Sequence, residues 1–218
     1  MPKVKQTDEA AELPNAFSLL MPSWQAVKLN FITFIELIAI PFMVELLGVI
    51  FVRHGHGPGA NFIFSILGDV LSLLLAPAMI VVQLASVRGE RIDLLPAIRT
   101  SLKYFWRYVG LAICMLVIIG VGLALLIVPG LFMLRRYILA PYYLIDQDLK
   151  ISEALRKSAE QSKRFSNAVW GLLGVEILFV LLVFFIIGFV LSIMYYCAPA
   201  LRYRQIKEAS GHKSPAKA

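Results

Sequence analysis

Apolar residues gather along the chain into five long stretches, which are separated by short segments rich in charge, glycine or proline. The stretches cover residues 29–52, 60–87, 108–128, 131–145 and 167–201. All but the fourth exceed the ~18 apolar residues that predict a helix crossing a bilayer. The pattern therefore predicts an all-α, polytopic transmembrane helical bundle.

The fifth stretch is too long for one simple span. As a single helix, residues 167–201 would be ~52 Å long at ~1.5 Å per residue, whereas the hydrocarbon core of a bilayer is ~30 Å thick. The stretch is therefore either one overlong helix or a hairpin of two short helices. An internal repeat and the distribution of charge both favour the hairpin.

The repeat is seen in two places. Residues 97–101 (AIRTS) recur as residues 154–158 (ALRKS), and Ala140-Pro141 recurs 58 residues later as Ala198-Pro199. A fainter copy, containing Ala76-Pro77, begins the chain. Each unit is predicted to be an amphipathic lead-in helix followed by a transmembrane hairpin. The second hairpin would turn at Pro129-Gly130, and the third near residues 186–188. Prolines 41, 77, 141 and 199 lie inside the apolar stretches and predict helix kinks.

Basic residues lie almost entirely between the predicted hairpins. Residues 1–28, 88–107, 146–166 and 202–218 carry three, five, five and five Lys or Arg, which is 18 of the 21. Because cytoplasmic loops are enriched in Lys and Arg, we expect about six spans with both termini cytoplasmic. The predicted parts are a cytoplasmic N-terminal segment 1–28, a membrane domain 29–205 with hairpins 29–87, 108–146 and 167–204, and a basic tail 206–218.

The two internal linkers show helical amphipathic patterns. Their apolar positions recur every three or four residues, and cations occupy the other positions. Helices of this kind lie in the membrane interface with their cations near anionic headgroups. Packing on the protein's own spans would produce the same pattern, and both arrangements can hold together. The predicted interfacial cations are Arg91, Arg99, Lys103, Arg107, Arg156, Lys157, Lys163 and Arg164.

Composition agrees with a membrane protein and excludes a soluble enzyme. Apolar residues make up 59% of the 218 and charged residues 16%, with a net charge of +7. In soluble domains, apolar residues average ~45–50% and charged residues ~25%. Outside the tail, the histidines are His54 and His56, too few for a metal site. No nucleophile–base motif occurs. We expect no enzyme activity, cofactor, metal or nucleic-acid partner.

Charges inside the apolar stretches are the best candidate site. Such charges cost ~2.5–3.5 kcal/mol at the bilayer centre, so they usually have partners or a function. Counting residues from the span ends places four of them in the outer half of the bilayer, namely Glu45, Asp69, Arg135 and Arg136. We expect Arg136 to pair with Glu45 or Asp69. A polar substrate or headgroup site and a proton relay are the alternatives. Glu36 and Glu176 lie deeper and are expected to be neutral hydrogen-bonded acids.

An ordered series of short motifs resembles a known family. The series comprises residues 127–131 (IVPGL), Arg136, residues 139–141 (LAP), residues 144–146 (LID) and residues 153–158 (EALRKS). It resembles the YciC-like uncharacterised membrane proteins, and is similar to membrane domains attached to some glycerophosphoryl diester phosphodiesterases. The resemblance implies a multi-pass α-helical bacterial membrane protein. The phosphodiesterase chemistry resides in a separate soluble domain of those relatives, so it is not implied here.

Three functions remain open at this point. The leading one is a non-enzymatic protein of the cytoplasmic (inner) membrane that acts in envelope organisation, lipid association or partnership with other membrane proteins. The alternative is a small transporter or permease-like module with a polar site near Arg135 and Arg136. A lipid-acting membrane enzyme is the least favoured, because no nucleophile–base set is visible.

Overall fold

The protein is described by a computed structural model over residues 13–53, 57–125, 127–182 and 193–210. Every regular element in these ranges is a helix. The predicted turn near residues 186–188 and the histidines of the H-x-H motif lie outside them. The elements are η1 (Ala16–Leu19), α1 (Leu20–Leu29), α2 (Phe31–Arg53), α3 (Gly57–Val87), α4 (Leu94–Leu102), α5 (Phe105–Leu125), α6 (Ile127–Tyr137), α7 (Ala140–Asp146), α8 (Ile151–Arg164), α9 (Ser166–Leu182) and α11 (Ala198–Ala209).

Three helices are long and apolar enough to cross a membrane. They contain the segments Phe31–Phe51 of α2, Phe62–Val87 of α3 and Phe105–Ala124 of α5. A shorter apolar segment, Ser166–Val180, forms most of α9. Many large side chains of these helices are exposed, as Phe62 and Leu116 illustrate at 67% and 72%. Water would solvate so much apolar surface poorly, so the exposure agrees with a lipid environment.

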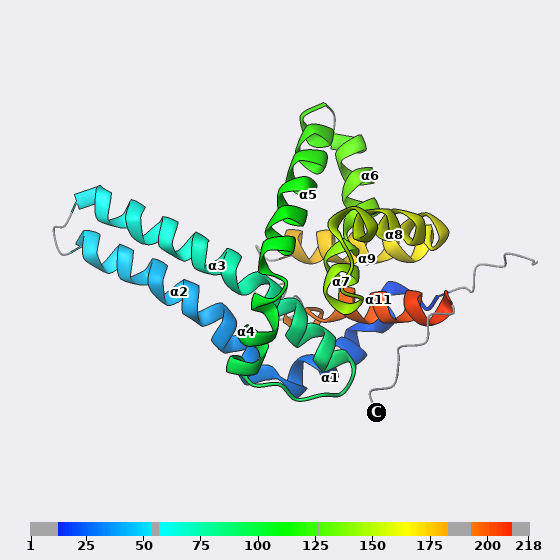
Figure 1. Ribbon diagram of the computed structural model, residues 1–218, viewed down its shortest axis with the longest axis horizontal. Coiled ribbons are helices and arrows are strands. Elements are labelled where there is room, and N and C mark those ends of the chain that lie inside the picture. The colour runs from blue at the N-terminus through cyan, green and yellow to red at the C-terminus, as the bar shows by residue number, and fades with distance from the viewer. Residues whose placement is uncertain (1–12, 54–56, 126, 183–192, 211–218) are drawn as a thin grey trace, which may run out of the picture.

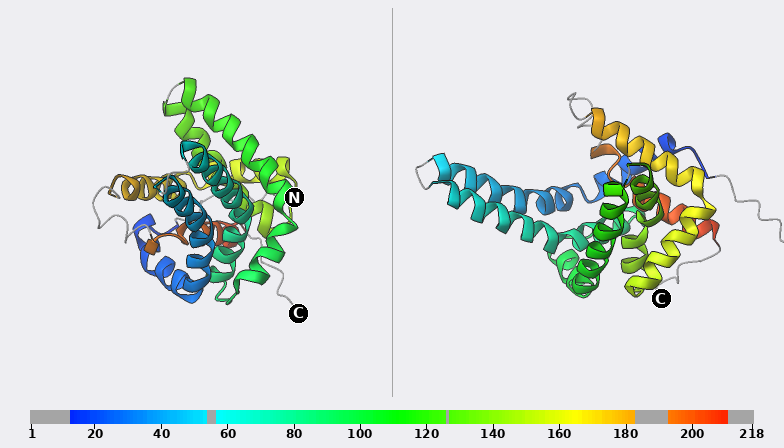
Figure 2. Two further views of the ribbon diagram at one scale, coloured as in Figure 1. Left: turned by 90° about the vertical axis from the view of Figure 1, so that its left-hand side faces the viewer. Right: turned by 90° about the horizontal axis from the view of Figure 1, so that it is seen from above.

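The hairpins diverge instead of forming the compact bundle expected from the sequence. Helix α2 packs along α3, and α5 packs along α6. The α2–α3 hairpin projects away from the base of the molecule in one direction and the α5–α6 hairpin in another (Figures 1 and 2). Apolar side chains surround the outer part of each hairpin, and lipid solvates such side chains as well as another helix does. In lipid, contact between the outer parts of the two hairpins would therefore gain no free energy from the burial of apolar surface.

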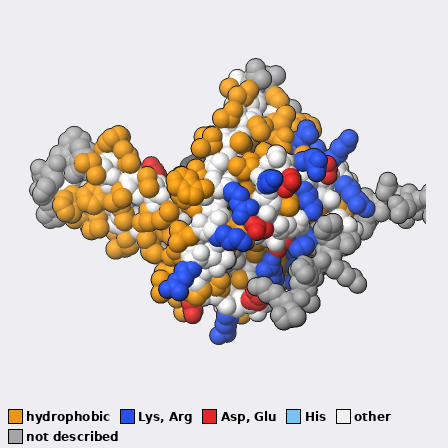
Figure 3. Space-filling view, in the orientation of Figure 1, with side chains coloured by type: hydrophobic (Ala, Val, Ile, Leu, Met, Phe, Trp, Pro, Cys, Tyr) orange, Lys and Arg blue, Asp and Glu red, His pale blue; other side chains and the backbone are white. Residues whose placement is uncertain are grey.

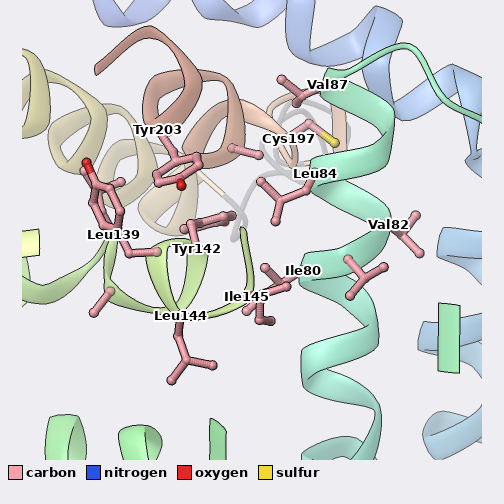
Figure 4. Packing of buried hydrophobic residues seen from close by; sticks show 14 of the residues in the cluster. Ile80, Val82, Leu84, Val87, Leu139, Tyr142, Leu144, Ile145, Cys197 and Tyr203 are labelled. Carbon is pink, nitrogen blue, oxygen red and sulfur yellow. The ribbon is translucent and has the colours of Figure 1, made fainter. Parts of the chain in front are cut away.

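The hairpins join at a buried core at their bases. The C-terminal part of α3 packs there against α7 and α11 (Figure 4). Val82, Ala140 and Ala198, which are spaced 58 residues apart, are all fully buried. The 58-residue spacing thus extends to the first hairpin, but it matches Val82-Gln83, and not the predicted Ala76-Pro77, to the Ala-Pro pairs of the other two units.

Two of the four predicted proline kinks are helix starts. Pro41 and Pro77 lie inside α2 and α3, as expected. Pro141 and Pro199 instead occupy the first turns of α7 and α11. Proline lacks a backbone N–H and cannot donate to a preceding turn, but the first turn of a helix requires no such bond. The chain therefore breaks before each Ala-Pro pair.

Candidate functional site

A buried carboxylate connects the three hairpin units at their base. Asp146, the last residue of α7, has a side chain only 3% exposed. It accepts a hydrogen bond from Lys207 Nζ at 2.6 Å, and further bonds from Arg88 and from the Tyr203 hydroxyl. Burial alone would raise the pKa of Asp146, but the hydrogen bonds from Lys207 and Tyr203 and the charges of Lys207 and Arg88 together lower it. Asp146 is therefore held ionised.

A second layer of polar contacts surrounds this carboxylate. Gln147 donates to the Tyr203 hydroxyl at 3.2 Å, and Lys157 Nζ donates to Gln147 Oε1 at 2.6 Å. Burial and the charge of Lys207 lower the pKa of Lys157. Arg204 donates to the carbonyl oxygen of Val87 at 2.7 Å, next to a cavity of about 220 Å³. Each of the cations described near Asp146, namely Arg88, Lys157, Arg204 and Lys207, thus has a partner already, which favours a structural role for the cluster.

Helix α4 exposes apolar and basic side chains together. Leu95 and Leu102 are 68% and 52% exposed and lie seven residues apart, so they share one side of α4. Trp106, which is 80% exposed, follows the break after α4 and lies in the first turn of α5. Arg99 and Lys103 are exposed beside them. On the opposite side, Ala97 and Ser101 are buried against the core. One side of α4 therefore packs on the protein, as one of the two arrangements predicts, while its outer side carries the apolar and basic side chains that the other arrangement requires.

Helix α8 differs because its exposed side is entirely polar. Ala154, Ser158, Ala159 and Ser162 are buried against the spans. Figure 3 shows the contrast between the surface around α8, where Lys and Arg side chains (blue) gather, and the hydrophobic α2–α3 hairpin (orange). Among the cations predicted to be interfacial, six are exposed, while Arg107 and Lys157 are half-buried. The exposed six are Arg91, Arg99, Lys103, Arg156, Lys163 and Arg164.

The half-buried Arg107 forms a fixed contact between the linkers. Asp148 accepts hydrogen bonds from Lys103 Nζ at 3.1 Å and from Arg107 Nη2 at 2.5 Å. The hydrogen bonds from Arg107 and Lys103 lower the pKa of Asp148. Two of the predicted headgroup-binding cations therefore also hold α4 and the start of α5 to the segment before α8.

The two adjacent arginines of α6 have different surroundings from those expected. Both lie in the last turn of this short helix, where cations complement the helix dipole. Arg135 Nη1 donates to Ser166 Oγ at 2.6 Å, and its guanidinium lies 5.4 Å from the ring centres of Phe132 and Trp170. The Arg136 side chain is exposed, while its carbonyl oxygen accepts a hydrogen bond from Ser158 at 2.9 Å.

The acids expected to pair with these arginines lie elsewhere. Glu45 and Asp69 are exposed on the α2–α3 hairpin, and the Glu45 side chain covers Gly68 on the facing helix. Among the ion pairs of the described residues, none joins either acid to Arg135 or Arg136. Counting depths along one continuous fourth span missed the break after α6. Glu36 and Glu176 are half-buried on α2 and α9.

Arg136 instead faces the next lead-in helix across a cavity. The cavity, of about 330 Å³, lies between α6 and α8 and is lined by the cations Arg136, Arg156 and Lys163. Glu160 also lines it, and its carboxylate lies 3.8 Å from Arg156. Three cations against one acid leave an excess positive charge that suits a phosphate group.

The Asp146 cluster was only partly visible in the sequence. Asp146 belongs to the family-like series, but its partners Arg88, Tyr203 and Lys207 had not been singled out. The available signal is the repeat itself, because Arg88, Asp146 and Arg204 are spaced 58 residues apart. In the described part of the chain, no three His, Cys, Asp or Glu side chains meet as a metal site. Neither a family model, nor a curated protein, nor a solved structure matches this chain significantly.

Proposed function

We propose that this chain is a non-enzymatic, multi-pass protein of the cytoplasmic membrane that associates with anionic lipids through its basic lead-in helices. The observation that carries the proposal is the outward side of α4. There Leu95 and Leu102 are exposed beside Arg99 and Lys103, and Trp106 is exposed nearby in the first turn of α5. Apolar side chains of this kind enter the boundary region of a bilayer, Trp favours that depth, and neighbouring cations meet anionic headgroups.

The cavity between α6 and α8 supplies a second contact for headgroups. Its cations Arg136, Arg156 and Lys163 are exposed and come from two different helices, so together they can enclose a phosphate. Envelope organisation and partnership with other membrane proteins remain roles in which such lipid contacts would be used. The exposed apolar sides of α2 and α5 are available to lipid or to a partner helix.

The proposed topology has six spans in three hairpins, with both termini cytoplasmic. The charge distribution and the buried positions that recur at 58-residue spacing support it. We also propose kinship with the YciC-like membrane proteins, supported by the ordered series from residues 127–131 to residues 153–158. Epitope tags at both termini test the topology. Both should be protected from impermeant reagents in intact cells, and exposure of either would contradict it.

Thermal unfolding in lipid nanodiscs tests the lipid association. The full chain is compared in phosphatidylcholine alone and in an equal mixture with phosphatidylglycerol. We expect a higher Tm in the mixture and loss of the difference at high salt, which screens surface charge. The double variant Arg91→Gln/Arg99→Gln should reduce the stabilisation by about 1 kcal/mol per cation.

A matched control changes charge of the opposite sign in the same segment. The double variant Glu90→Gln/Asp93→Asn removes two exposed acids, so it should preserve or increase the advantage of the anionic mixture. Equal stability of the wild-type chain in both lipid compositions would refute the proposed association. A loss of similar size in the acidic control would show that charge attraction is not the cause.

A small carrier is the second candidate, and the cavity at Arg136 favours it. A carrier of small anions would require this arginine for uptake. Proteoliposomes and inorganic phosphate as the probe distinguish the two functions. Uptake that depends on Arg136 would favour the carrier, while lipid-dependent stability without uptake would favour the lipid-associated role.

A further inference from the structure

A groove runs along one side of the α2–α3 hairpin. It encloses about 480 Å³, within the range of small-molecule sites. Its walls are mostly apolar, and Leu37, Leu75 and Ile80 are buried in them at 2%, 6% and 8% exposure. Both walls belong to helices that are long and apolar enough to cross a membrane. The groove therefore opens to lipid rather than to water.

One end of the groove is polar. Gln83, buried at 6% exposure, accepts a hydrogen bond from the Tyr142 hydroxyl at 2.8 Å. Its amide nitrogen donates to the carbonyl oxygen of Tyr196 over 3.4 Å, and an amide nitrogen carries a second hydrogen. Tyr108 also lines this end, and its hydroxyl has no hydrogen-bond partner among the described residues. Hydrogen-bond donors on Gln83 and Tyr108 are thus available to a ligand at this end of the groove.

The polar groups at this end are all uncharged. The charged residue that lines the groove is Glu45, toward the tip of the hairpin and away from Gln83. No lysine or arginine in the described part of the chain lines it. A phosphate held here would be desolvated without a counter-charge, which is strongly unfavourable. A hydroxyl or carbonyl group fits the available donors and acceptors.

Depth gives the orientation of the occupant. Gln83 lies one turn before the end of α3 at Val87, close to the interfacial helix α4. The apolar part extends from there to Ser72, which at ~1.5 Å per residue is ~16 Å of helix. This length is about half the ~30 Å hydrocarbon core, the thickness of one leaflet. A lipid chain would lie along the groove with its head at Gln83.

We infer that the groove is a binding site for a neutral lipid whose head group is a hydroxyl or an ester carbonyl. The head is bound by Gln83 and Tyr108, and one hydrocarbon chain lies in the groove along the side of α2 and α3. The inference requires this hairpin to lie in the membrane, but it is independent of the proposed binding of anionic headgroups at α4 and α8.

Photocrosslinking tests the site directly. The full chain in phosphatidylcholine nanodiscs is irradiated with a clickable monoacylglycerol that carries a diazirine in its chain, and the adducts are mapped by mass spectrometry. We expect adducts on residues 37–45 and 72–83, and competition by unlabelled monoacylglycerol but not by phosphatidylglycerol. Adducts spread equally over the exposed side of α5, or equal competition by phosphatidylglycerol, would overturn the inference.

Variants separate the head-group contact from the chain contact. Gln83→Leu should weaken competition by monoacylglycerol about fivefold, the change expected for one hydrogen bond. Ala76→Phe places bulk in the groove and should remove the adducts there. Ala124→Phe, a matched change on the exposed side of α5, should leave them unchanged.

Tm measurements identify variants that fail to fold, and mapping on the wild-type chain does not depend on them. Unchanged labelling in a folded Ala76→Phe protein would overturn the inference. Because the probe is neutral and phosphatidylglycerol is added only as a competitor, failure of the probe to label the groove leaves the proposed anionic lipid association intact.

Discussion

Lys207 on α11 donates a hydrogen bond to Asp146 at the end of α7, with 2.6 Å between Nζ and Oδ2. The two residues belong to different hairpin units, and Arg88 brings in the third unit by pairing with the same carboxylate. The Asp146 side chain is almost fully buried, and its contacts help to hold all three units together. This arrangement leads to the first two predictions.

Replacing Asp146 by Asn should destabilise the fold by about 2–3 kcal/mol. Breaking a buried ion pair typically costs ~3–5 kcal/mol, and the value here is smaller because Arg88 is 40% exposed. Chemical unfolding in detergent measures the change. Asp148→Asn is the control, since Asp148 also pairs with two cations but is exposed, and its effect should be clearly smaller. Equal effects would argue against a special role for the buried carboxylate.

Stability should also fall in acid through Asp146. Its folded pKa is lowered, so its contribution is present above the unfolded value of about 3.9 and is lost as pH falls through the lower folded value. A Tm series from about pH 6 to pH 3 should show a decline that is reduced in Asp146→Asn. Identical declines in the two proteins would assign the acid sensitivity to other carboxylates.

The close approach of α5 and α6 predicts a contrast between two glycines. A Cβ added at Gly130 would lie 2.8 Å from the backbone nitrogen of Leu123, whereas one added at Gly120 would meet nothing within 4 Å. Gly130→Ala should therefore cost about 1–3 kcal/mol through forced separation of the helices. Gly120→Ala should be neutral or stabilise by up to about 1 kcal/mol, because alanine favours helix more than glycine does.

Thermal unfolding of the two glycine variants in the same detergent gives this comparison. A neutral Gly130→Ala variant would mean that the hairpin packs less closely than the structure shows.

The adjacent arginines of α6 should respond differently to substitution. Arg135→Leu removes the bond to Ser166 and the contacts with Phe132 and Trp170, so it should destabilise the packing of α6 on α9 by about 1–3 kcal/mol. Arg136→Leu should have little effect on stability, because its exposed guanidinium lies 5.7 Å from the ring centre of the adjacent Tyr137 and its hydrogen bond to Ser158 is made by the backbone. Folded yield and Tm measure both. Greater damage from Arg136→Leu would revive the paired-charge interpretation of that residue.

The apolar pattern predicted the helical class and the three long candidate spans, because length and hydropathy depend on local sequence alone. The break between α6 and α7 was harder to predict. Pro141 was interpreted as a kink, although proline also favours a helix start. The divergence of the hairpins was also not predicted, and it separates Arg135 and Arg136 on α6 from Glu45 and Asp69 on the α2–α3 hairpin. The interpretation of residues 131–145 as one span gave no sign that α6 ends at Tyr137 and that α7 begins at Ala140.

The lead-in helices show a second limit of sequence patterns. Periodicity identified an amphipathic helix at residues 151–164, but α8 buries a side made of alanine and serine. Small residues carry little hydropathy, so the pattern did not reveal that they pack closely against the spans. The groove residues Gln83, Tyr108 and Tyr142 were missed for a related reason. They come from three separate helices and meet only where the hairpins join at their bases.

The bonds around Asp146 have a consequence for how the chain could be divided. The carboxylate is held by side chains that precede α4 or follow α9, so its contacts need no continuous backbone between the units. If the chain were cut in the linker before α8, one polypeptide would carry Arg88 and Asp146, and the other would carry Tyr203 and Lys207. Co-expressed, they should reassemble into one complex, and either half alone should be degraded.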